Sequence, residues 1–336
     1  MRAALFGTGA VGSRVARQLA STEGLEDLLL VDTSPARAEA VAASLGPPAR
    51  VGSGMADAQR VDVVVLAVSG DHRTLAEQAL EQGANVVSVA DDIDEVRSLL
   101  DLDAEARERG VSVAVGAGFA PGLTCVLARH AATTVDVVDE IHVAKAGTGG
   151  PSCARQHHRA LGGTAVDWRD GAWIRRPGGS GRELCWFPDP LGGQDCYRGA
   201  LADALVLVPA FAGVQRVTAR MAATRRDRLT AKLPMLRPPH PEGVIGGVRV
   251  EVRGRRGTTS DVLVLGAIDR PAVACGAVAA VTAAWAADHR LGRNGAAGLA
   301  ELLDDTAPFL RELARRGVKA ATFEGGGAAT GAAVPG

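Results

Sequence analysis

The chain has 336 residues, which is more than one ordinary domain holds, so we expect two domains. Its 37 Lys and Arg residues nearly balance its 38 Asp and Glu residues, so no net field attracts polyanions and no nucleic-acid partner is implied. No stretch of about 18 apolar residues predicts a membrane span, and no early segment resembles a secretory signal. Together with five scattered cysteines, these features favour a cytoplasmic protein with no membrane partner.

Strand and helix patterns alternate through the first part of the chain. Short apolar runs, of the kind that parallel strands buried on both faces need, occur at residues 2–6, 28–31, 61–68, 85–89 and 111–115. Helices are expected after the glycine-rich loop 7–12, after Ser34-Pro35, and at residues 73–81 and 92–109. This alternation predicts an α/β fold with a doubly wound parallel sheet of the Rossmann type.

The pattern changes beyond Gly116 and predicts a second domain of mixed α+β type. Its expected elements are a helix at 123–130, a strand at 140–144, a hairpin at Asp170-Gly171, and antiparallel strands at 248–253 and 261–265. Helices at 271–288 and 299–316 are expected to pack back on the first domain. The predicted division is a Rossmann domain at 1–122, a substrate and oligomerisation domain at 123–268, C-terminal helices at 269–323 and a disordered tail at 324–336.

A dinucleotide site is predicted at the loop between the first strand and the first helix, Gly7-Thr8-Gly9-Ala10-Val11-Gly12. Gly7 permits the tight turn, Gly9 lets the backbone approach a pyrophosphate, and Gly12 lets the helix pack close to the strand. The helix N-terminus then presents free N–H groups to the anion. We therefore expect NAD or NADP as the cofactor.

Residues after the second strand bear on the choice between these two cofactors. Asp32 is expected to accept hydrogen bonds from the adenosine ribose, and its charge repels a 2′-phosphate, which favours NAD. Thr33, Ser34 and Arg37 lie where a 2′-phosphate would sit, and an arginine there can pair with it, so NADP stays open. Two further cofactor contacts are expected at the carboxyl ends of later strands: Ser69 and Gly118.

A polar window at residues 145–198, punctuated by glycines, is expected to form the substrate site. Arginines there can pair with substrate carboxylates, and the first candidates are Arg155 and Arg198, with Tyr197 beside them. The window also holds three of the four candidates for proton transfer, which are His157, His158, Lys145 and, outside it, Asp91. Adjacent histidines point in different directions, so at most one of them is expected to face the reacting atom.

A metal site is a weaker interpretation of residues 145–198. Cys153 and His157 are four residues apart and would share one face of a helix, with Cys185 or Cys196 as further ligands. No recognised zinc spacing is completed, so we expect no metal.

Several segments in order give the chain a resemblance to the saccharopine dehydrogenase family of NAD(P)-dependent reductases, which includes saccharopine reductase and carboxynorspermidine dehydrogenase. The segments are the glycine loop, Asp32, the turn 118–122, the Asp170-Gly171 hairpin between tryptophans, and the run 187–192. The resemblance implies hydride transfer at a carbon bearing nitrogen, and a homodimer. Saccharopine reductases often carry a His-x-Glu segment where this chain has residues 198–203, and this departure argues against saccharopine itself as the substrate.

Two alternative functions stay open on the sequence. One is an amino-acid dehydrogenase of another family, similar to diaminopimelate dehydrogenase and acting on a primary amine. The other is a non-catalytic protein that senses NAD(P), although the polar window offers more site-like groups than a sensor needs.

Overall fold

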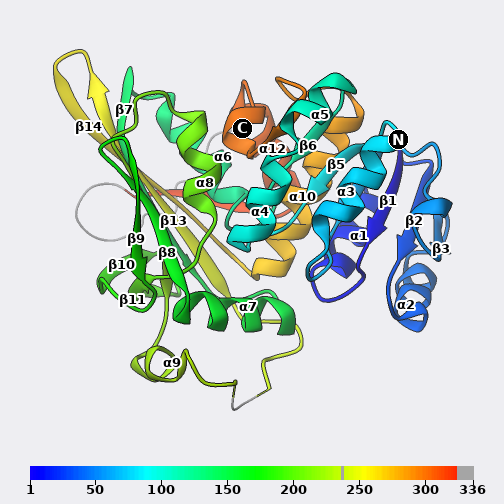
Figure 1. The fold of residues 1–336 in the computed structure, drawn as a ribbon, viewed down its shortest axis with the longest axis horizontal. Helices are drawn as coiled ribbons and strands as arrows, with labels where there is room; N and C mark the ends of the chain where they lie inside the picture. The colour runs from blue at the N-terminus through cyan, green and yellow to red at the C-terminus, as the bar shows by residue number, and fades with distance from the viewer. Residues whose placement is uncertain (236–237, 324–336) are drawn as a thin grey trace.

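The computed structural model describes residues 1–235 and 238–323 and has two lobes, each built on one β-sheet (Figure 1). The chain forms most of the first lobe, crosses to the second after residue 117, and adds a strand to each sheet near its end. The tail predicted at 324–336 lies outside the described residues. Within the described ranges, no helix is both long and apolar enough to cross a bilayer.

The first sheet has seven strands, all parallel, in the order β15-β6-β5-β4-β1-β2-β3. They are β1 (Arg2–Phe6), β2 (Asp27–Val31), β3 (Ala49–Gly52), β4 (Val63–Leu66), β5 (Asn85–Ser88), β6 (Ser112–Ala114) and β15 (Gly295–Ala297). The order reverses between β1 and β4, as in a Rossmann sheet. β4 and β5 are buried along their whole length, which explains the continuous apolar sequence of β4.

Helices complete the first lobe. The N-terminal ones are α1 (Gly12–Ala20), α2 (Pro35–Leu45), η1 (Met55–Asp57), α3 (His72–Glu81), α4 (Ile93–Leu100) and α5 (Asp103–Glu108). The C-terminal ones are α10 (Pro271–Ala287), α11 (Leu299–Leu302) and α12 (Thr306–Arg315). The long apolar α10 packs against α1, β4 and β5, so the end of the chain covers part of the first sheet.

The second sheet has nine strands, and β12 and β7 are its only parallel neighbours in the part of the chain described. The main path runs β10-β11-β12-β7-β13-β14-β16, and the β8–β9 hairpin joins it through β12. The strands are β7 (Val137–Ala146), β8 (Thr164–Arg169), β9 (Ala172–Pro177), β10 (Glu183–Phe187), β11 (Gly192–Arg198), β12 (Arg216–Ala222), β13 (Gly246–Arg256), β14 (Thr259–Asp269) and β16 (Lys319–Phe323).

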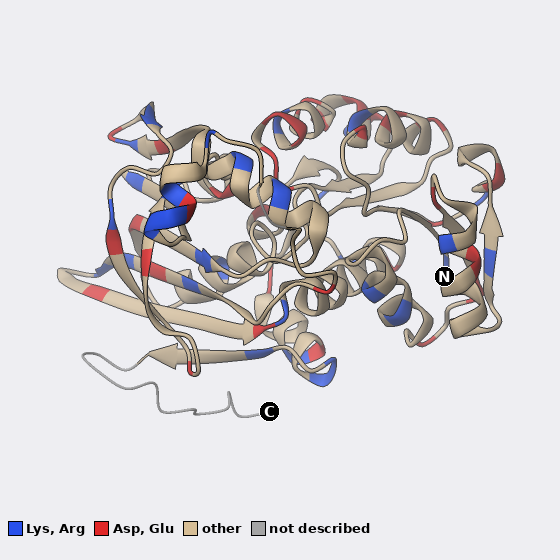
Figure 2. Cartoon of the chain, turned by 90° about the horizontal axis from the view of Figure 1, so that it is seen from below, with Lys and Arg blue, Asp and Glu red and all other residues tan. Residues whose placement is uncertain are grey.

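The helices α6 (Leu123–Ala132) and α8 (Asp203–Leu207) lie between the two sheets (Figure 1). α6 packs against β7, β13 and β14, and α8 packs against β12, so both cover the same, inner face of the second sheet. The helices α7 (Pro151–Gly162) and α9 (Arg225–Thr230) lie at one end of this lobe, and η2 (Val208–Ala210) follows α8. Seen from below, basic residues lie on both the helices and the strands of the second lobe (Figure 2).

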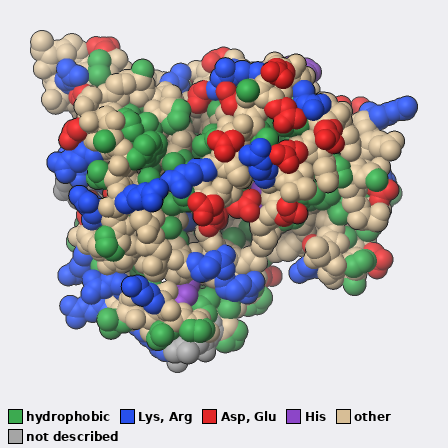
Figure 3. All heavy atoms as spheres, viewed as in Figure 1, with side chains coloured by type: hydrophobic (Ala, Val, Ile, Leu, Met, Phe, Trp, Pro, Cys, Tyr) green, Lys and Arg blue, Asp and Glu red, His purple; other side chains and the backbone are tan. Residues whose placement is uncertain are grey.

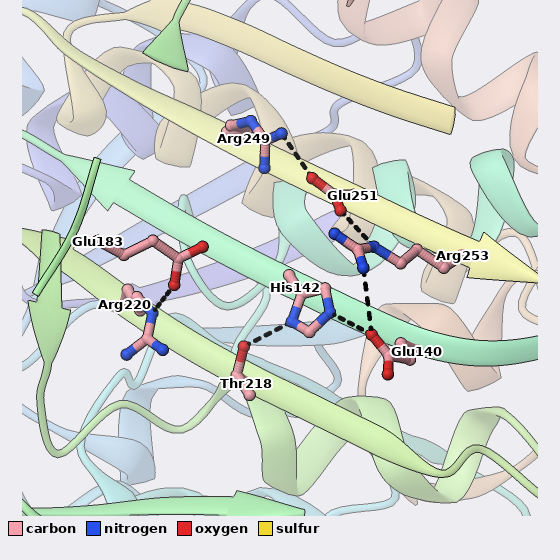
Figure 4. A network of polar contacts seen from close by, with 8 residues as sticks. All are labelled: Glu140, His142, Glu183, Thr218, Arg220, Arg249, Glu251 and Arg253. Atoms are coloured by element: carbon pink, nitrogen blue, oxygen red, sulfur yellow. Dashed lines mark hydrogen bonds and ion pairs between the residues drawn. The ribbon is translucent and has the colours of Figure 1, made fainter. Parts of the chain in front are cut away.

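The two faces of the second sheet differ because side chains alternate along each strand. On β7, Ile141, Val143 and Lys145 face the helices, whereas Glu140 and His142 face away from them. The outer face carries a set of ion pairs and hydrogen bonds, in which the Arg220–Glu183 pair is separate from the rest (Figure 4). Its members are Glu140, His142, Glu183, Thr218, Arg220, Arg249, Glu251 and Arg253. Many polar residues of the second lobe therefore form contacts on the outer face of the second sheet.

The predicted α/β fold, a Rossmann sheet followed by a mixed α+β part, is confirmed. The predicted hairpin is confirmed as well, since Trp168 and Trp173 pair directly across β8 and β9. Two expected helices are each interrupted: residues 92–109 form α4 and α5, and residues 299–316 form α11 and α12 because Asp305 caps a new helix through the N–H of Ala307.

Six strands were not expected: β3, β10, β11, β12, β15 and β16. β3 is an edge strand with exposed central residues, and β15 is a Gly-Ala-Ala segment, so neither shows the apolar, β-branched pattern of a buried strand.

Candidate functional site

A cavity of about 1300 Å³ lies between the two lobes at the carboxyl ends of β1, β2, β4 and β5. Its opposite wall comes from the end of β7, the loop 147–150 and α7. Pockets for drug-sized ligands measure roughly 300–1,000 Å³, so this cavity has room for a dinucleotide and a second small molecule. On the face shown in Figure 3, acidic side chains gather over the first lobe and basic ones over the second.

The glycine loop has the geometry that a dinucleotide needs. Gly7 has a φ of +92°, and a Cβ there would lie 2.4 Å from the carbonyl oxygen of Ala67. A Cβ on Gly12 would lie 1.8 Å from the carbonyl oxygen of Gly7, so only glycine lets α1 start this close to the turn. Gly9 instead has open space where its Cβ would be. The residues present thus leave room for a pyrophosphate at the start of α1, and the loop from Gly7 to Val11 lines the cavity.

Asp32, at the end of β2, is held by four hydrogen bonds. Its Oδ2 accepts from the N–H of Thr8 at 2.7 Å and from the Thr8 hydroxyl at 2.8 Å. Its Oδ1 accepts from the N–H of Ser34 at 2.8 Å and from Arg37 Nη2 at 2.7 Å. Burial raises the pKa of Asp32, but these hydrogen bonds from Ser34, Thr8 and Arg37 outweigh it and lower the pKa to about 2. The carboxylate is therefore charged and its acceptor positions are filled.

This arrangement of Asp32 and Arg37 bears on the choice between NAD and NADP. Arg37 neutralises the charge on Asp32 that would repel a 2′-phosphate, and about half of the Arg37 side chain is exposed at the cavity wall. A ribose hydroxyl that binds Asp32 has to displace one of its present donors. Thr33 also lines the cavity, whereas Ser34 contributes its backbone N–H to Asp32.

A buried histidine that the sequence argument missed joins the loops after β4 and β5. One ring nitrogen of His72 lies 2.9 Å from the Ser88 hydroxyl, and the other lies 3.2 Å from the carbonyl oxygen of Val68. Burial lowers the pKa of His72, so the ring is neutral. His72 and Ser69 both line the cavity, whereas Gly118 packs beneath it against Cys275. The position of His72, just after a strand's carboxyl end, was the signal that could have found it.

The two lobes meet inside the cavity through an ion pair between Lys145 and Asp91. Nζ of Lys145, on the inner face of β7, lies 3.4 Å from Oδ2 of Asp91, in the loop after β5. The neighbouring Asp92 caps α4 and accepts a hydrogen bond from Gln156 of α7 at 2.7 Å. Lysine is scarce in this chain: only three of its 37 basic residues are lysines, and Lys145 is the one in the cavity.

The helix α7 brings two arginines to the cavity. Arg155 was expected there, and its Nη2 lies 3.2 Å from the hydroxyl of Ser152. Arg159 follows one turn later on the same face and lines the cavity too, with a hydrogen bond of 2.7 Å to Gln156. Arg159 was not singled out from the sequence, although its i+4 spacing from Arg155 on a helix was the available signal.

The two adjacent histidines of α7 are placed differently. His157 lines the cavity, and its Nε2 lies 3.1 Å from the carbonyl oxygen of Ala222. Burial, helped by the nearby Lys145 ammonium, lowers the pKa of His157 to about 4. His158 is turned away and pairs through Nε2 with the carbonyl oxygen of Leu233 at 2.7 Å. His157 is thus neutral near pH 7.

Two expected substrate contacts are not brought to the cavity. Arg198 pairs with Arg220 in the register of β11 and β12, which puts it on the outer face of the second sheet, where it bonds Asp167 at 3.1 Å. Tyr197 faces inward but is only 1% exposed. Cys185 and Cys196 pack in a small apolar cluster with Ala144, away from α7. In the described ranges, no three His, Cys, Asp or Glu side chains gather closely enough to hold a metal ion.

Comparisons with known proteins agree with this geometry. Residues 1–117 match an oxidoreductase family with an NAD-binding Rossmann fold. Saccharopine dehydrogenase (L-Glu forming) from Saccharomyces cerevisiae has a similar structure, with a TM-score of 0.69 and 14% identity over 96% of this chain and 100% of that one. The chain shares its two-lobed fold.

Two further solved structures are similar. Amine dehydrogenase from Mycobacterium smegmatis matches with a TM-score of 0.54 and 14% identity, over 91% of this chain and 96% of that one. An engineered D-amino acid dehydrogenase bound to NADP⁺ matches with a TM-score of 0.51 and 17% identity, over 92% and 95%. The predicted Rossmann domain for NAD or NADP is confirmed by the family match, and the resemblance to saccharopine dehydrogenase is confirmed for the fold.

We expect Arg37→Ala to weaken the binding of NADPH about tenfold and that of NADH less than threefold, because a charge-assisted bond to the 2′-phosphate is lost. Fluorescence titration of both reduced cofactors measures the two dissociation constants. Arg50→Ala, which removes an arginine paired with Asp27 outside the cavity, is the control. Equal weakening of both cofactors by Arg37→Ala would contradict the placement of Arg37 beside the 2′-position.

The low pKa of His157 predicts a pH-dependent stability. Between about pH 4 and 6.5 the unfolded chain binds a proton at this histidine that the folded protein does not, so the free energy of unfolding falls as the pH is lowered through this range. A shift of this size corresponds to roughly 3 kcal/mol. Urea unfolding at several pH values should show this slope reduced in His157→Gln but not in His158→Gln. An unchanged slope in His157→Gln would refute the assignment.

Proposed function

We propose that this protein is an NAD(P)-dependent dehydrogenase or reductase that transfers a hydride at a carbon bearing nitrogen in a small amino-acid-derived substrate. The observation that carries the proposal is the ion pair between Lys145 and Asp91. This pair lines the same cavity as the glycine loop. The printed names of the similar structures, a saccharopine, an amine and an amino-acid dehydrogenase, support chemistry at a C–N bond.

The choice of lysine supports a role in proton transfer. Arginine stays protonated in proteins, whereas lysine can lose its proton when its surroundings favour this. A chain that uses arginine almost everywhere else has a lysine at 145, with a side chain that is 10% exposed. A group that only had to supply charge would need no such exception.

The chemistry divides between the cofactor and the chain. When bound, the nicotinamide ring accepts or delivers the hydride. Oxidation of an amine by hydride loss leaves a protonated C=N bond, whose nitrogen then gives one proton to the unprotonated Nζ of Lys145. Reduction of an imine takes that proton back from the Lys145 ammonium. The low pKa of His157, about 4, makes its ring a weak base, so it takes no part as a base in this scheme. His158 and Arg198 lie away from the cavity, so neither takes part in the proposed reaction.

The arginines of α7 are proposed to bind substrate carboxylates. Arg155 and Arg159 lie one helical turn apart on the cavity wall, and each guanidinium can form a bidentate pair with a carboxylate. The proposed cofactor contacts are the residues of the glycine loop, with Asp32, Thr33 and Arg37 at the adenosine end and Ser69 toward the nicotinamide. Ser34 supports the site through its bond to Asp32.

We further propose that the protein works in the cytoplasm as a homodimer that pairs through the second sheet. Its five cysteines are free thiols, and four of them are buried, which suits a reducing compartment. Helices cover the inner face of this sheet, whereas the outer face carries the network of Figure 4 and the exposed Val262.

We expect Lys145→Arg to keep the ion pair with Asp91 but to lower kcat by about 10²–10⁴-fold, because the guanidinium cannot exchange a proton. The assay is NADH oxidation with the oxo acid and amine that support turnover in a screen of ammonia and larger amines. Cofactor affinity, measured separately, should stay within threefold of the parent protein. A Lys145→Arg variant with normal kcat would reject lysine as the proton carrier.

The proposed homodimer is tested separately, by its mass in solution. Light scattering after gel filtration should give twice the chain mass for the parent protein, and the chain mass for Val262→Glu, which places a charge on the outer sheet face. A Leu229→Glu variant, changed at an exposed residue of α9, should remain dimeric. A monomeric parent protein would contradict the dimer.

A further inference from the structure

The loop after β5 is anchored on both sides of Asp91. Before Asp91, the N–H of Ala90 donates a hydrogen bond of 3.2 Å to the hydroxyl of Ser88, the last residue of β5. After Asp91, the carboxylate of Asp92 caps the start of α4. Asp91 therefore lies between two fixed points of the backbone, and the direction of its carboxylate toward Lys145 depends on both.

The hydroxyl of Ser88 is itself held by His72, the first residue of α3. Nδ1 of His72 lies 2.9 Å from Oγ of Ser88, and Nε2 lies 3.2 Å from the carbonyl oxygen of Val68, in the loop after β4. Both side chains are buried, because His72 is 2% exposed and Ser88 is 0% exposed. Loss of either bond would therefore leave a buried polar atom without a partner.

The partners of the imidazole ring determine which of its nitrogens carries the proton. A carbonyl oxygen can only accept, so Nε2 of His72 carries the proton in the bond to Val68. Burial lowers the pKa of His72, so the ring is neutral and Nδ1 is an acceptor. The hydroxyl of Ser88 then donates to Nδ1, and its oxygen accepts the N–H of Ala90. The donors of this series all point the same way, from Ala90 through Ser88 and His72 to Val68.

The backbone of His72 is anchored as well. Glu95, in the first turn of α4, accepts the N–H of Asp71 through Oε1 and the N–H of His72 through Oε2, each at 3.2 Å. Val68 and Asp91 both line the cavity. His72 therefore joins the loop after β4 to the loop after β5, on the wall of the cavity that the first lobe supplies.

We propose that Ser88 and His72 are positioning residues, which act through the N–H of Ala90 to aim the carboxylate of Asp91 at Lys145. An apolar residue at position 88 would also fill the buried space, but it would leave the N–H of Ala90 and Nδ1 of His72 unpaired. This role rests on the proposed function, because the aim of Asp91 matters to catalysis only if its pair with Lys145 takes part in proton transfer.

The series of hydrogen bonds can be tested on the parent protein. Neutron diffraction from crystals of the full chain near pH 7 locates the exchangeable hydrogens directly, after exchange into deuterium oxide. We expect deuterium on Nε2 of His72, none on Nδ1, and a Ser88 hydroxyl that points at Nδ1. Deuterium on Nδ1, or a hydroxyl that points elsewhere, would overturn the proposal.

Crystal structures of two serine variants test the effect on Asp91 without any turnover. In Ser88→Ala the N–H of Ala90 loses its acceptor, so we expect the distance from the Asp91 carboxylate to Nζ of Lys145 to exceed about 4 Å, which is too long for an ion pair. The control is Ser112→Ala in the neighbouring strand β6, where another buried serine loses a hydrogen bond of 2.9 Å outside the cavity. An unchanged ion pair in Ser88→Ala would refute the positioning role.

Kinetics separate this role from the proposed function. If the Lys145–Asp91 pair takes part in proton transfer, Ser88→Ala should lower kcat about tenfold and leave the cofactor affinity within about threefold of the parent value. In an Asp91→Asn background the same change should lower kcat less than about twofold, because Ser88 acts through Asp91. A tenfold loss in both backgrounds would refute the positioning role. If Asp91 moves in the crystal and kcat stays unchanged, the positioning role stands and the catalytic role of the pair fails.

Discussion

The ion pair between Lys145 and Asp91 is the contact on which the site depends, because it joins the two lobes inside the cavity that both of them form. Two simple rules bring it about. Parallel strands collect their carboxyl ends at one edge of the sheet, which places Asp91 there, and alternation along β7 turns Lys145 to the inner face of the second sheet. Each lobe supplies one partner, so the pair exists only in the assembled cavity.

Around this contact the two lobes contribute different kinds of group. The first lobe supplies backbone geometry: a glycine loop with no side chain in the way, a helix start, and Asp32 fixed by four hydrogen bonds. The second lobe supplies side chains that can pair with carboxylates, namely Arg155 and Arg159 of α7. In the proposed function, this division lets a common cofactor domain serve a substrate that the second lobe selects.

The sequence predicted the first lobe well and the second only in outline. The strands, the glycine loop and Asp32 follow local rules of spacing and burial, so they needed no knowledge of distant contacts. The strand β15 and the network of Figure 4 depend on pairing between segments far apart in the chain, which a local pattern does not contain. Arg198 illustrates this limit. The spacing between Lys145 and Arg198 in the sequence does not show which face of the sheet Arg198 occupies, because that face is set by the register of β11 on β12. Lys145 is the only lysine in the window 145–198, and this signal in the sequence would have ranked it above both histidines.

The central claim is that a hydride moves between the dinucleotide and a carbon bearing nitrogen in the cavity beside Lys145. Incubation of the protein with NADH carrying deuterium at the transferable position, an oxo acid and an amine tests it most directly, because mass spectrometry and NMR locate the label in the product. The account predicts deuterium on the carbon attached to the amine nitrogen, and its loss in Lys145→Arg. Deuterium on a carbon attached to oxygen, or no transfer with any amine, would contradict it.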